Sequence, residues 1–532
     1  MAHAMTETRA REWLLAAATG VLYPLCFPNY DLPILAWVVL VPLHLAIDDL
    51  RPRRAWIVGW IAGTIAFGLT MFWVVTAMHV YGQMPLPFAY LALALLALYL
   101  GLYVAAYAAG FTLIHRQWPG AAFLIAAPLW VSLELLRTYA FSGLPWALLG
   151  YSQAGVLPVI QSASYVGVYG ISGLIVLTNV AVVAIALKLR GRQIHWWTYA
   201  VPAVAVALLA ADVFYGQAAL RPGGRESRTV RVGVVQPNID QAHKWDRAFA
   251  DDTIARYVRL TTEIASGSDL VIWPEAATPF LFEREPAYRD EIAALTKRLE
   301  TPLVFGSPAL RYYDNGRPYL LNSAYLLGSD GTIIGRYDKR HLVPFGEYIP
   351  LKSILFFLDK LVVGIGDFEA GTVPAVLRIP PRAADGAGTP SRPDGPTFGV
   401  VICFEVIFPD LVREFVREGA NFMVTITNDA WFGDSAAPYQ HFGMVVLRAV
   451  ENRVAFARAA NTGISGFIDP HGRVTAATPI FREDAQAGTV VLGDGPTFYS
   501  MHGDVFAYGC VILAAFMLPA AMAAGRWRRD RR

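Results

Sequence analysis

The sequence of 532 residues has only three cysteines, and charged residues make up no more than 16% of it, whereas 55% of its residues are hydrophobic. So low a charged fraction argues against an ordinary water-soluble protein. The more polar part, residues 215–500, carries a net charge of −4, so there is no basic excess for a nucleic-acid partner. The ten histidines show no metal-ligand spacing such as His-Glu-x-x-His, and we expect no metal and no cofactor.

The charges are unevenly distributed along the chain. Residues 1–214 contain 10 basic and 7 acidic residues, whereas residues 215–500 contain 29 and 33. We therefore predict a membrane domain, a soluble domain, a final membrane helix and a basic tail, at residues 1–214, 229–492, 503–525 and 526–532.

Long apolar runs predict the membrane helices. Most are long enough to cross about 30 Å of hydrocarbon as a helix. Two runs of about 15 residues contain prolines; we interpret them as spans, with a re-entrant hairpin as the alternative. Together the runs predict eight transmembrane helices, at residues 13–27, 34–47, 56–78, 87–114, 121–140, 160–187, 196–214 and 505–524.

Basic residues predict the orientation in the membrane. They occupy alternate connections, such as those around Arg53 and Arg190, and the C-terminal tail, whereas the short connections at 28–33, 79–86 and 141–159 have none. The positive-inside rule then places both termini in the cytoplasm and residues 229–492 outside.

The soluble domain alternates short β-branched runs with helical stretches, which predicts an α/β layered fold. The strands are expected at 230–236, 269–273, 303–306, 323–327, 332–337, 397–403 and 422–428, and the helices at 251–266, 288–299, 410–418 and 441–458.

Three predicted strands end in reactive side chains. Glu275, Lys339 and Cys403 each follow a buried strand, and such strand ends are where catalytic groups converge in α/β sheets. Cys403 has no partner cysteine in its domain, so it is a candidate nucleophile. Taken singly, each residue has a structural alternative: a solvated loop charge, a surface lysine and an inert core cysteine. Together they favour an acyl-transfer site.

Several motifs extend this interpretation. They are Trp273-Pro-Glu-Ala, Tyr337-Asp-Lys-Arg-His-Leu-Val-Pro-Phe-Gly-Glu-Tyr348, Ile402-Cys-Phe-Glu405, Thr427-Asn-Asp-Ala-Trp-Phe-Gly433 and Asn461-Thr-Gly-Ile-Ser465. They resemble the signature blocks of the nitrilase superfamily and, within it, of the apolipoprotein N-acyltransferases, over nearly the whole chain. One departure is Phe404, where the family more often has Tyr. The resemblance implies an αββα sandwich in residues 229–492, attached to a multi-pass α-helical membrane domain.

The resemblance also implies a two-step reaction at the outer face of a bacterial inner membrane. An acyl chain of a phospholipid, typically phosphatidylethanolamine, passes to Cys403 as a thioester and then to the N-terminal amine of a diacylglyceryl apolipoprotein. Glu275 would act as general base and acid, and Lys339 would stabilise the oxyanion. We expect a monomer.

Other residues are supporting candidates. Glu347 and Glu405 resemble acidic residues of the family near the triad, and structural salt bridges are their alternative. Trp245 and Trp431 are candidates for lining the substrate entry, with loop packing as the alternative. Trp146 belongs to a family-like segment on an outer loop. Phe356 and Phe357 lie in the apolar segment 351–363, which is expected either to dip into lipid or to pack in the core.

Two other functions remain open. A membrane-tethered amidase would use the same triad but release its acyl group to water. A transporter or scaffold is disfavoured because the membrane spans contain few charged residues for a solute pathway.

Overall fold

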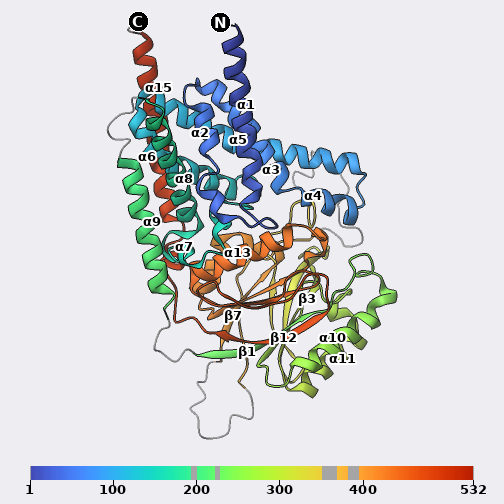
Figure 1. The fold of residues 1–532 in the computed structure, drawn as a ribbon. Coiled ribbons are helices and arrows are strands. Elements are labelled where there is room, and N and C mark those ends of the chain that lie inside the picture. Colours follow the sequence, from blue (N-terminus) through green and yellow to red (C-terminus); the bar gives the residue numbers. More distant parts are fainter. Residues whose placement is uncertain (1, 193–199, 222–227, 350–367, 382–394, 531–532) are drawn as a thin grey trace. The chain divides into compact units, whose positions relative to one another are not determined.

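The computed structural model describes residues 2–192, 200–221, 228–349, 368–381 and 395–530 (Figure 1). The chain divides into two compact units. The membrane unit comprises residues 1–75, 85–221 and 502–532, and the catalytic unit comprises residues 76–84 and 222–501. The segment 351–363, with Phe356 and Phe357, lies outside the described residues.

The membrane unit is built from helices. They are α1 (Ala2–Leu25), η1 (Pro33–Trp37), α2 (Val41–Ile47), α3 (Pro52–Thr70), α4 (Trp73–Thr76), α5 (Leu86–Gln117), α6 (Pro119–Tyr139), η3 (Leu149–Gln153), α7 (Leu157–Ile160), α8 (Ala163–Leu189), α9 (Ala200–Ala219) and α15 (Val505–Asp530). Small residues let some of these helices approach closely. A side chain added at Gly59 or Gly63 of α3 would collide with Val104 of α5, so this contact requires glycine.

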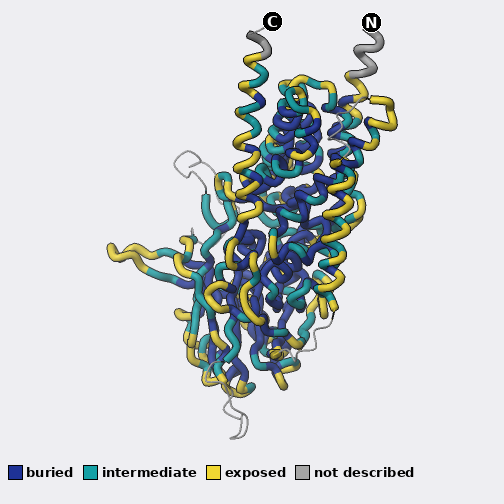
Figure 2. The backbone as a smooth tube through the Cα atoms, turned by 90° about the vertical axis from the view of Figure 1, so that its left-hand side faces the viewer, coloured by how far each residue is buried: buried dark blue, intermediate teal, exposed yellow. Residues whose placement is uncertain are grey.

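Five described helices are long and apolar enough to cross a membrane, namely α5, α6, α8, α9 and α15. A sixth span results if α3 and the helical segment Trp73–Tyr81, which are bent by 51° relative to each other, cross the membrane together. The predicted run at 34–47 forms the short helices η1 and α2, and the run at 13–27 lies in α1. Helix α15 exposes apolar side chains along its length, with Ile512 and Phe516 each 71% exposed, as suits a lipid-facing helix (Figure 2). The chain is thus a membrane protein, and the count of eight spans stays a prediction.

The catalytic unit contains two six-stranded sheets. The first has the order β12-β1-β2-β3-β4-β5 and the second β11-β10-β9-β8-β7-β6. Their strands are β1 (Thr229–Gln236), β2 (Leu270–Ile272), β3 (Leu303–Tyr312), β4 (Pro318–Leu327), β5 (Ile333–Asp338), β6 (Val376–Arg378), β7 (Thr397–Ile402), β8 (Phe422–Thr427), β9 (Phe456–Ala460), β10 (Gly466–Ile468), β11 (Val474–Ala477) and β12 (Asp484–Val491). Parallel pairs β1–β2–β3 and β7–β8–β9 form the centres of the two sheets.

Helices complete the α/β fold of the catalytic unit. They are η2 (Ala77–Tyr81), η5 (Arg247–Phe249), α10 (Ala250–Ile264), η6 (Phe282–Arg284), α11 (Pro286–Leu299), η7 (Cys403–Ile407), α12 (Pro409–Arg417), η8 (Asp429–Phe432), α13 (Ala437–Asn452) and α14 (Phe498–His502). Ile254 and Tyr257 of α10 and Ile292 of α11 are buried in one core cluster with Phe305 of β3 and Trp273, which directly follows β2. This cluster fixes β2, the strand that leads into Glu275.

One predicted helix is wrong at its end. The helix expected at 441–458 stops at Asn452, because Arg453 takes a left-handed conformation with φ 51°, and residues 456–460 form strand β9. The sequence Phe-Ala-Arg-Ala-Ala favours a helix locally, but pairing with β8 and β10 overrides that preference. The correction matters because Arg458 lies in the second sheet, where it contacts Asp429 and His441.

Candidate active site

Glu275, Lys339 and Cys403 meet in the catalytic unit although they come from distant parts of the chain. Glu275 follows β2, Lys339 follows β5, and Cys403 follows β7. Lys339 Nζ lies 3.4 Å from Glu275 Oε1. The charges of Glu275 and Lys339 both act on the thiol of Cys403, which places the three groups in one electrostatic cluster.

Lys339 is a buried cation between two carboxylates. Its side chain is 0% exposed, and Nζ donates to Glu347 at 2.9 and 3.0 Å. Burial alone favours the neutral amine, but Glu347 and Glu275 outweigh it and raise the pKa of Lys339 above its ordinary value. The amine therefore stays charged inside the protein, as an oxyanion stabiliser must.

Asn322, which the sequence analysis did not single out, bridges the two carboxylates. Its Nδ2 donates to Glu275 Oε1 and to Glu347 Oε1, each at 2.8 Å. The other oxygen of Glu275 accepts from the backbone N–H of Asn428 at 3.0 Å. These donors hold the Glu275 carboxylate in one orientation. Asn322 lies within β4, away from any strand end, so its sequence position gave no signal.

Cys403 occupies a strained elbow at the end of β7. Its φ is 52°, the left-handed region that non-glycine residues rarely adopt. Burial raises the pKa of the thiol, and the charges of Glu275 and Asp429 raise it further, whereas Lys339 lowers it. The thiol is therefore protonated near neutrality and needs a base before it can attack.

Glu405 ties the elbow to the strand that carries Lys339. Its carboxylate accepts the Ile402 N–H, the Arg340 N–H and the Tyr337 hydroxyl, each at 2.7 Å. One fully buried side chain thereby joins the end of β7 to the end of β5. This arrangement is a network of neutral donors on a carboxylate rather than the salt bridge considered from the sequence.

A second buried network reaches Cys403 from α13. His441 Nε2 lies 3.2 Å from the carbonyl oxygen of Cys403, and because a carbonyl only accepts, Nε2 carries the proton. Arg458 donates to His441 Nδ1 at 3.2 Å and to Asp429 at 2.7 Å. Burial and the charge of Arg458 lower the pKa of His441, against Asp429, whose Oδ1 lies 3.1 Å from Nδ1 and raises it. His441, Asp429 and Arg458 were missed from the sequence.

A cleft of about 70 Å³ opens beside Glu275. Trp245 and Trp431 both line it, with Asn322, Glu347 and Asn428. The indole N–H of Trp245 is buried and has no hydrogen-bond partner among the described residues. Trp146 lies instead in the membrane unit, where it is 1% exposed and packs against Trp73 with ring centroids 4.8 Å apart.

Lys244 adds a second buried amine to this region. It is 3% exposed, and Nζ donates to the carbonyl oxygen of Glu275 at 3.1 Å. Burial lowers its pKa to about 8, against the opposing charges of Glu275 and Cys403. No group of three or more His, Cys, Asp or Glu side chains fit to hold a metal occurs among the described residues.

Comparisons with known proteins cover both units. The model of the apolipoprotein N-acyltransferase N-terminal domain matches residues 19–181, and the carbon-nitrogen hydrolase model matches residues 231–495. A protein of Geobacter metallireducens named apolipoprotein N-acyltransferase is 43% identical over 96% of this chain and 95% of its own length. One of the same name from Chlorobaculum tepidum is 31% identical over 99% of each chain. Nit3 of Saccharomyces cerevisiae, a solved nitrilase-superfamily structure, matches 50% of this chain and 90% of its own, with 19% identity and a TM-score of 0.36.

Proposed function

Because the chain belongs to the apolipoprotein N-acyltransferase family, we propose that Cys403 accepts an acyl chain from a membrane phospholipid and passes it to the N-terminal amine of a diacylglyceryl apolipoprotein. The protein is an acyltransferase of the nitrilase superfamily. The observation that carries the proposal is the buried cluster in which Lys339 and Glu275 act on the Cys403 thiol.

In the first step, Glu275 takes the thiol proton and the sulfur attacks the ester carbonyl of the phospholipid. A carbon–sulfur bond forms, and the negative charge that develops on the carbonyl oxygen is stabilised by Lys339. When the carbon–oxygen bond breaks, Glu275 returns the proton to the departing oxygen and a lysophospholipid leaves. Glu347 and Asn322 act as positioning residues, because they hold Lys339 and Glu275.

In the second step, the amine of the lipoprotein attacks the thioester carbonyl. A carbon–nitrogen bond forms, the carbon–sulfur bond breaks, and Glu275 carries one amine proton to the sulfur of Cys403. The acyl-enzyme must wait for its second substrate, so water has to be kept from the thioester. Trp245 and Trp431, which line the cleft, are proposed to cover it.

The elbow supplies a further donor. The first N–H groups of a helix have no partner within that helix, and the N–H of Phe404 is one of these at the start of η7. His441 holds the carbonyl of the Cys403–Phe404 peptide, so the trans peptide directs the N–H to the opposite side. We assign this N–H to the oxyanion beside Lys339, and His441 to positioning it.

The proposal includes the acyl donor, the membrane in which the enzyme lies, its orientation and its oligomeric state. The donor is a bilayer phospholipid such as phosphatidylethanolamine, the membrane is the bacterial inner membrane, and the catalytic unit lies on its outer face with both termini in the cytoplasm. The protein acts as a monomer. The apolar segment 351–363, including Phe356 and Phe357, is proposed to admit the lipid chain.

A two-stage experiment tests the reaction. Purified protein is given phosphatidylethanolamine alone, and intact-mass and peptide analysis should find one acyl group on Cys403 with release of lysophospholipid. A diacylglyceryl-cysteine peptide added afterwards should receive that chain. Cys403→Ala should do neither, whereas Cys510→Ala, a matched loss of a membrane-unit thiol, should do both. Free fatty acid released equally with and without peptide would instead identify an amidase-like hydrolase.

A further inference from the structure

A larger cavity lies in the membrane unit, within one compact part of the chain. It has a volume of about 230 Å³ and is lined by residues from α1, from the end of α2 and from the end of α8. Its polar lining consists of Arg11, Asp48, Asp49, Arg190 and Arg192. No residue of the proposed catalytic cluster takes part in it.

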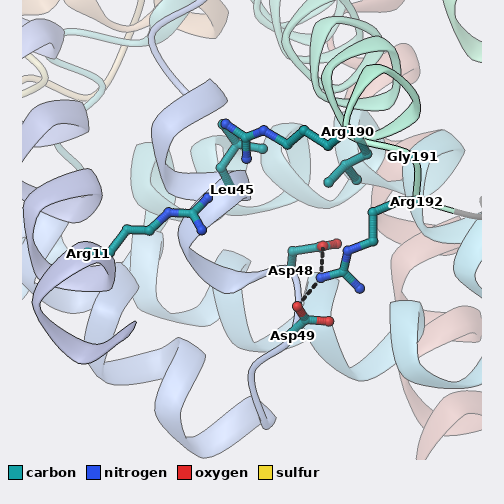
Figure 3. Close-up of a pocket in the computed structure, with 8 residues that line it drawn as sticks. Arg11, Leu45, Asp48, Asp49, Arg190, Gly191 and Arg192 are labelled. Carbon is teal, nitrogen blue, oxygen red and sulfur yellow. Dashed lines mark hydrogen bonds and ion pairs between the residues drawn. The ribbon is translucent and has the colours of Figure 1, made fainter. Parts of the chain in front are cut away.

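The two carboxylates of this cavity already have cationic partners. Arg192 Nη2 lies 3.2 Å from Asp48 Oδ2 and also pairs with Asp49 (Figure 3). His115 Nε2 approaches the other oxygen of Asp48 at 3.6 Å. The acidic charge of the lining is therefore engaged mainly by Arg192 and His115, and the charge of Arg190 also acts on Asp48 from beyond ion-pair distance.

Arg11 and Arg190 are differently placed. They come from α1 and from the residue after α8, and Figure 3 shows their guanidinium groups pointing toward each other across the cavity. Neither has an ion-pair partner among the residues that the structure describes. Two like charges that face each other repel, so an anion between them would relieve the repulsion and bind to both.

The guanidinium groups of Arg11 and Arg190 indicate which kind of anion would bind between them. A guanidinium presents a planar fork of N–H donors that matches the oxygens of a phosphate, often in pairs. A volume of about 230 Å³ holds several groups of the size of a water molecule, which occupies about 30 Å³, and so has room for a phosphate and part of its ester substituent. Basic pockets between membrane helices bind anionic headgroups in this way.

We propose that the cavity between Arg11, Arg190 and Arg192 is a binding site for a phosphate ester, supplied by the headgroup of an anionic phospholipid. The site is separate from the acyl-donor site and does not depend on the catalytic proposal. Bound there, the lipid bridges α1 and α8 and stabilises the membrane unit. Inorganic phosphate shares the chemistry and is the other possible source.

Binding is measured with delipidated full-length protein in a neutral detergent. The ligands are a short-chain phosphatidylglycerol, a phosphatidylcholine of the same chain length and inorganic phosphate at equal ionic strength. Phosphatidylglycerol should bind at least tenfold more tightly than phosphatidylcholine and raise the Tm. Arg11→Gln with Arg190→Gln should remove most of that preference, and the lysine replacements should keep part of it. Arg116→Gln, which removes one charge from another basic connection and lies outside the cavity, should change binding less than twofold.

The outcomes separate the alternatives. Inorganic phosphate that binds as tightly as phosphatidylglycerol, and loses affinity in the same double variant, assigns the site to free phosphate. Equal affinity for phosphatidylglycerol and phosphatidylcholine overturns the proposal, and so does an Arg116→Gln loss as large as that of the double variant. Arg11 and Arg190 are exposed, so their replacement should leave the fold intact, and an unchanged circular-dichroism spectrum checks this.

Discussion

His441 Nε2 donates to the carbonyl oxygen of Cys403 over 3.2 Å, so a helix residue 38 positions further along the chain holds the peptide that follows the nucleophile. That peptide belongs to a residue with a φ of 52°, a conformation that persists only when its surroundings enforce it. Arg458 and Asp429 fix the histidine ring in turn. The geometry of Cys403 therefore depends on His441 and, through it, on Arg458 and Asp429.

Replacing this histidine should impair the chemical step rather than binding. His441→Ala should slow acylation of Cys403 about 10- to 100-fold, because a lost hydrogen bond to a buried group costs about 1–3 kcal/mol. The KM for phospholipid should change little. His441→Gln, whose amide can still donate, should recover part of the rate, and His471→Ala, in the turn between β10 and β11, serves as control. If both His441 variants lost kcat and Tm to the same extent as each other, so that glutamine gave no rescue, His441 would have only a structural role in the core.

The sequence indicated which side chains lie together better than it indicated the strands of the two sheets. Glu275, Lys339 and Cys403 were recognisable because each follows a buried apolar strand, and the structure brings the three together. Asn322 and Asp429 were missed, because their roles come from partners that lie far away in the sequence.

The missed strands have local causes. Strand β12 has mostly half-exposed residues without a clear alternation, so Asp484–Val491 gave no strand pattern. Strand β9 is rich in alanine, and only its neighbours in the sheet make it extended. The predicted helix ran from residue 441 to residue 458, so the prediction did not indicate that Arg458 lies in a strand next to His441 and Asp429.

Glu347 should control the pH range over which Lys339 stays charged. Glu347 is the main cause that raises the pKa of Lys339 against burial, so Glu347→Gln should lower that pKa from its raised value. The stabilisation from a cation with a raised pKa is fully present at neutral pH and is lost only as the pH rises through that pKa. In Glu347→Gln the loss moves to lower pH.

The measurement is the rate of acylation between pH 6 and pH 11, and because the pKa of Lys339 is raised above its ordinary value, wild type should show little alkaline fall from this residue in that range. The alkaline fall in rate should occur at lower pH in Glu347→Gln than in wild type. Glu369→Gln, an exposed carboxylate in the same unit, should leave the profile unchanged. An unshifted alkaline limb in Glu347→Gln would contradict the assignment of Lys339 as the cation whose charge the reaction needs.

The orientation predicted from basic residues can be tested with single cysteines. In a background without the three native thiols, Ala242→Cys should react with a membrane-impermeant maleimide added to intact spheroplasts. Gly191→Cys should react only after the membrane is permeabilised. Labelling of residue 242 only after permeabilisation would place the catalytic unit in the cytoplasm and overturn the lipoprotein as acceptor.

The last prediction separates the acidity of the thiol from its use in catalysis. Burial is the largest cause of the raised pKa of Cys403, and the negative charge of Glu275 is the next. Glu275→Gln removes that charge, so it should lower the thiol pKa and speed alkylation of Cys403 by iodoacetamide at pH 9, measured by peptide mass analysis. The same variant should fail to take an acyl chain from phospholipid, because no group remains to carry the proton to the departing lysolipid oxygen. Lys339→Met should do the opposite to the thiol, since the loss of its cation raises the thiol pKa and slows alkylation further. Faster alkylation combined with normal acylation in Glu275→Gln would show that Glu275 only tunes the thiol and that another group moves the proton.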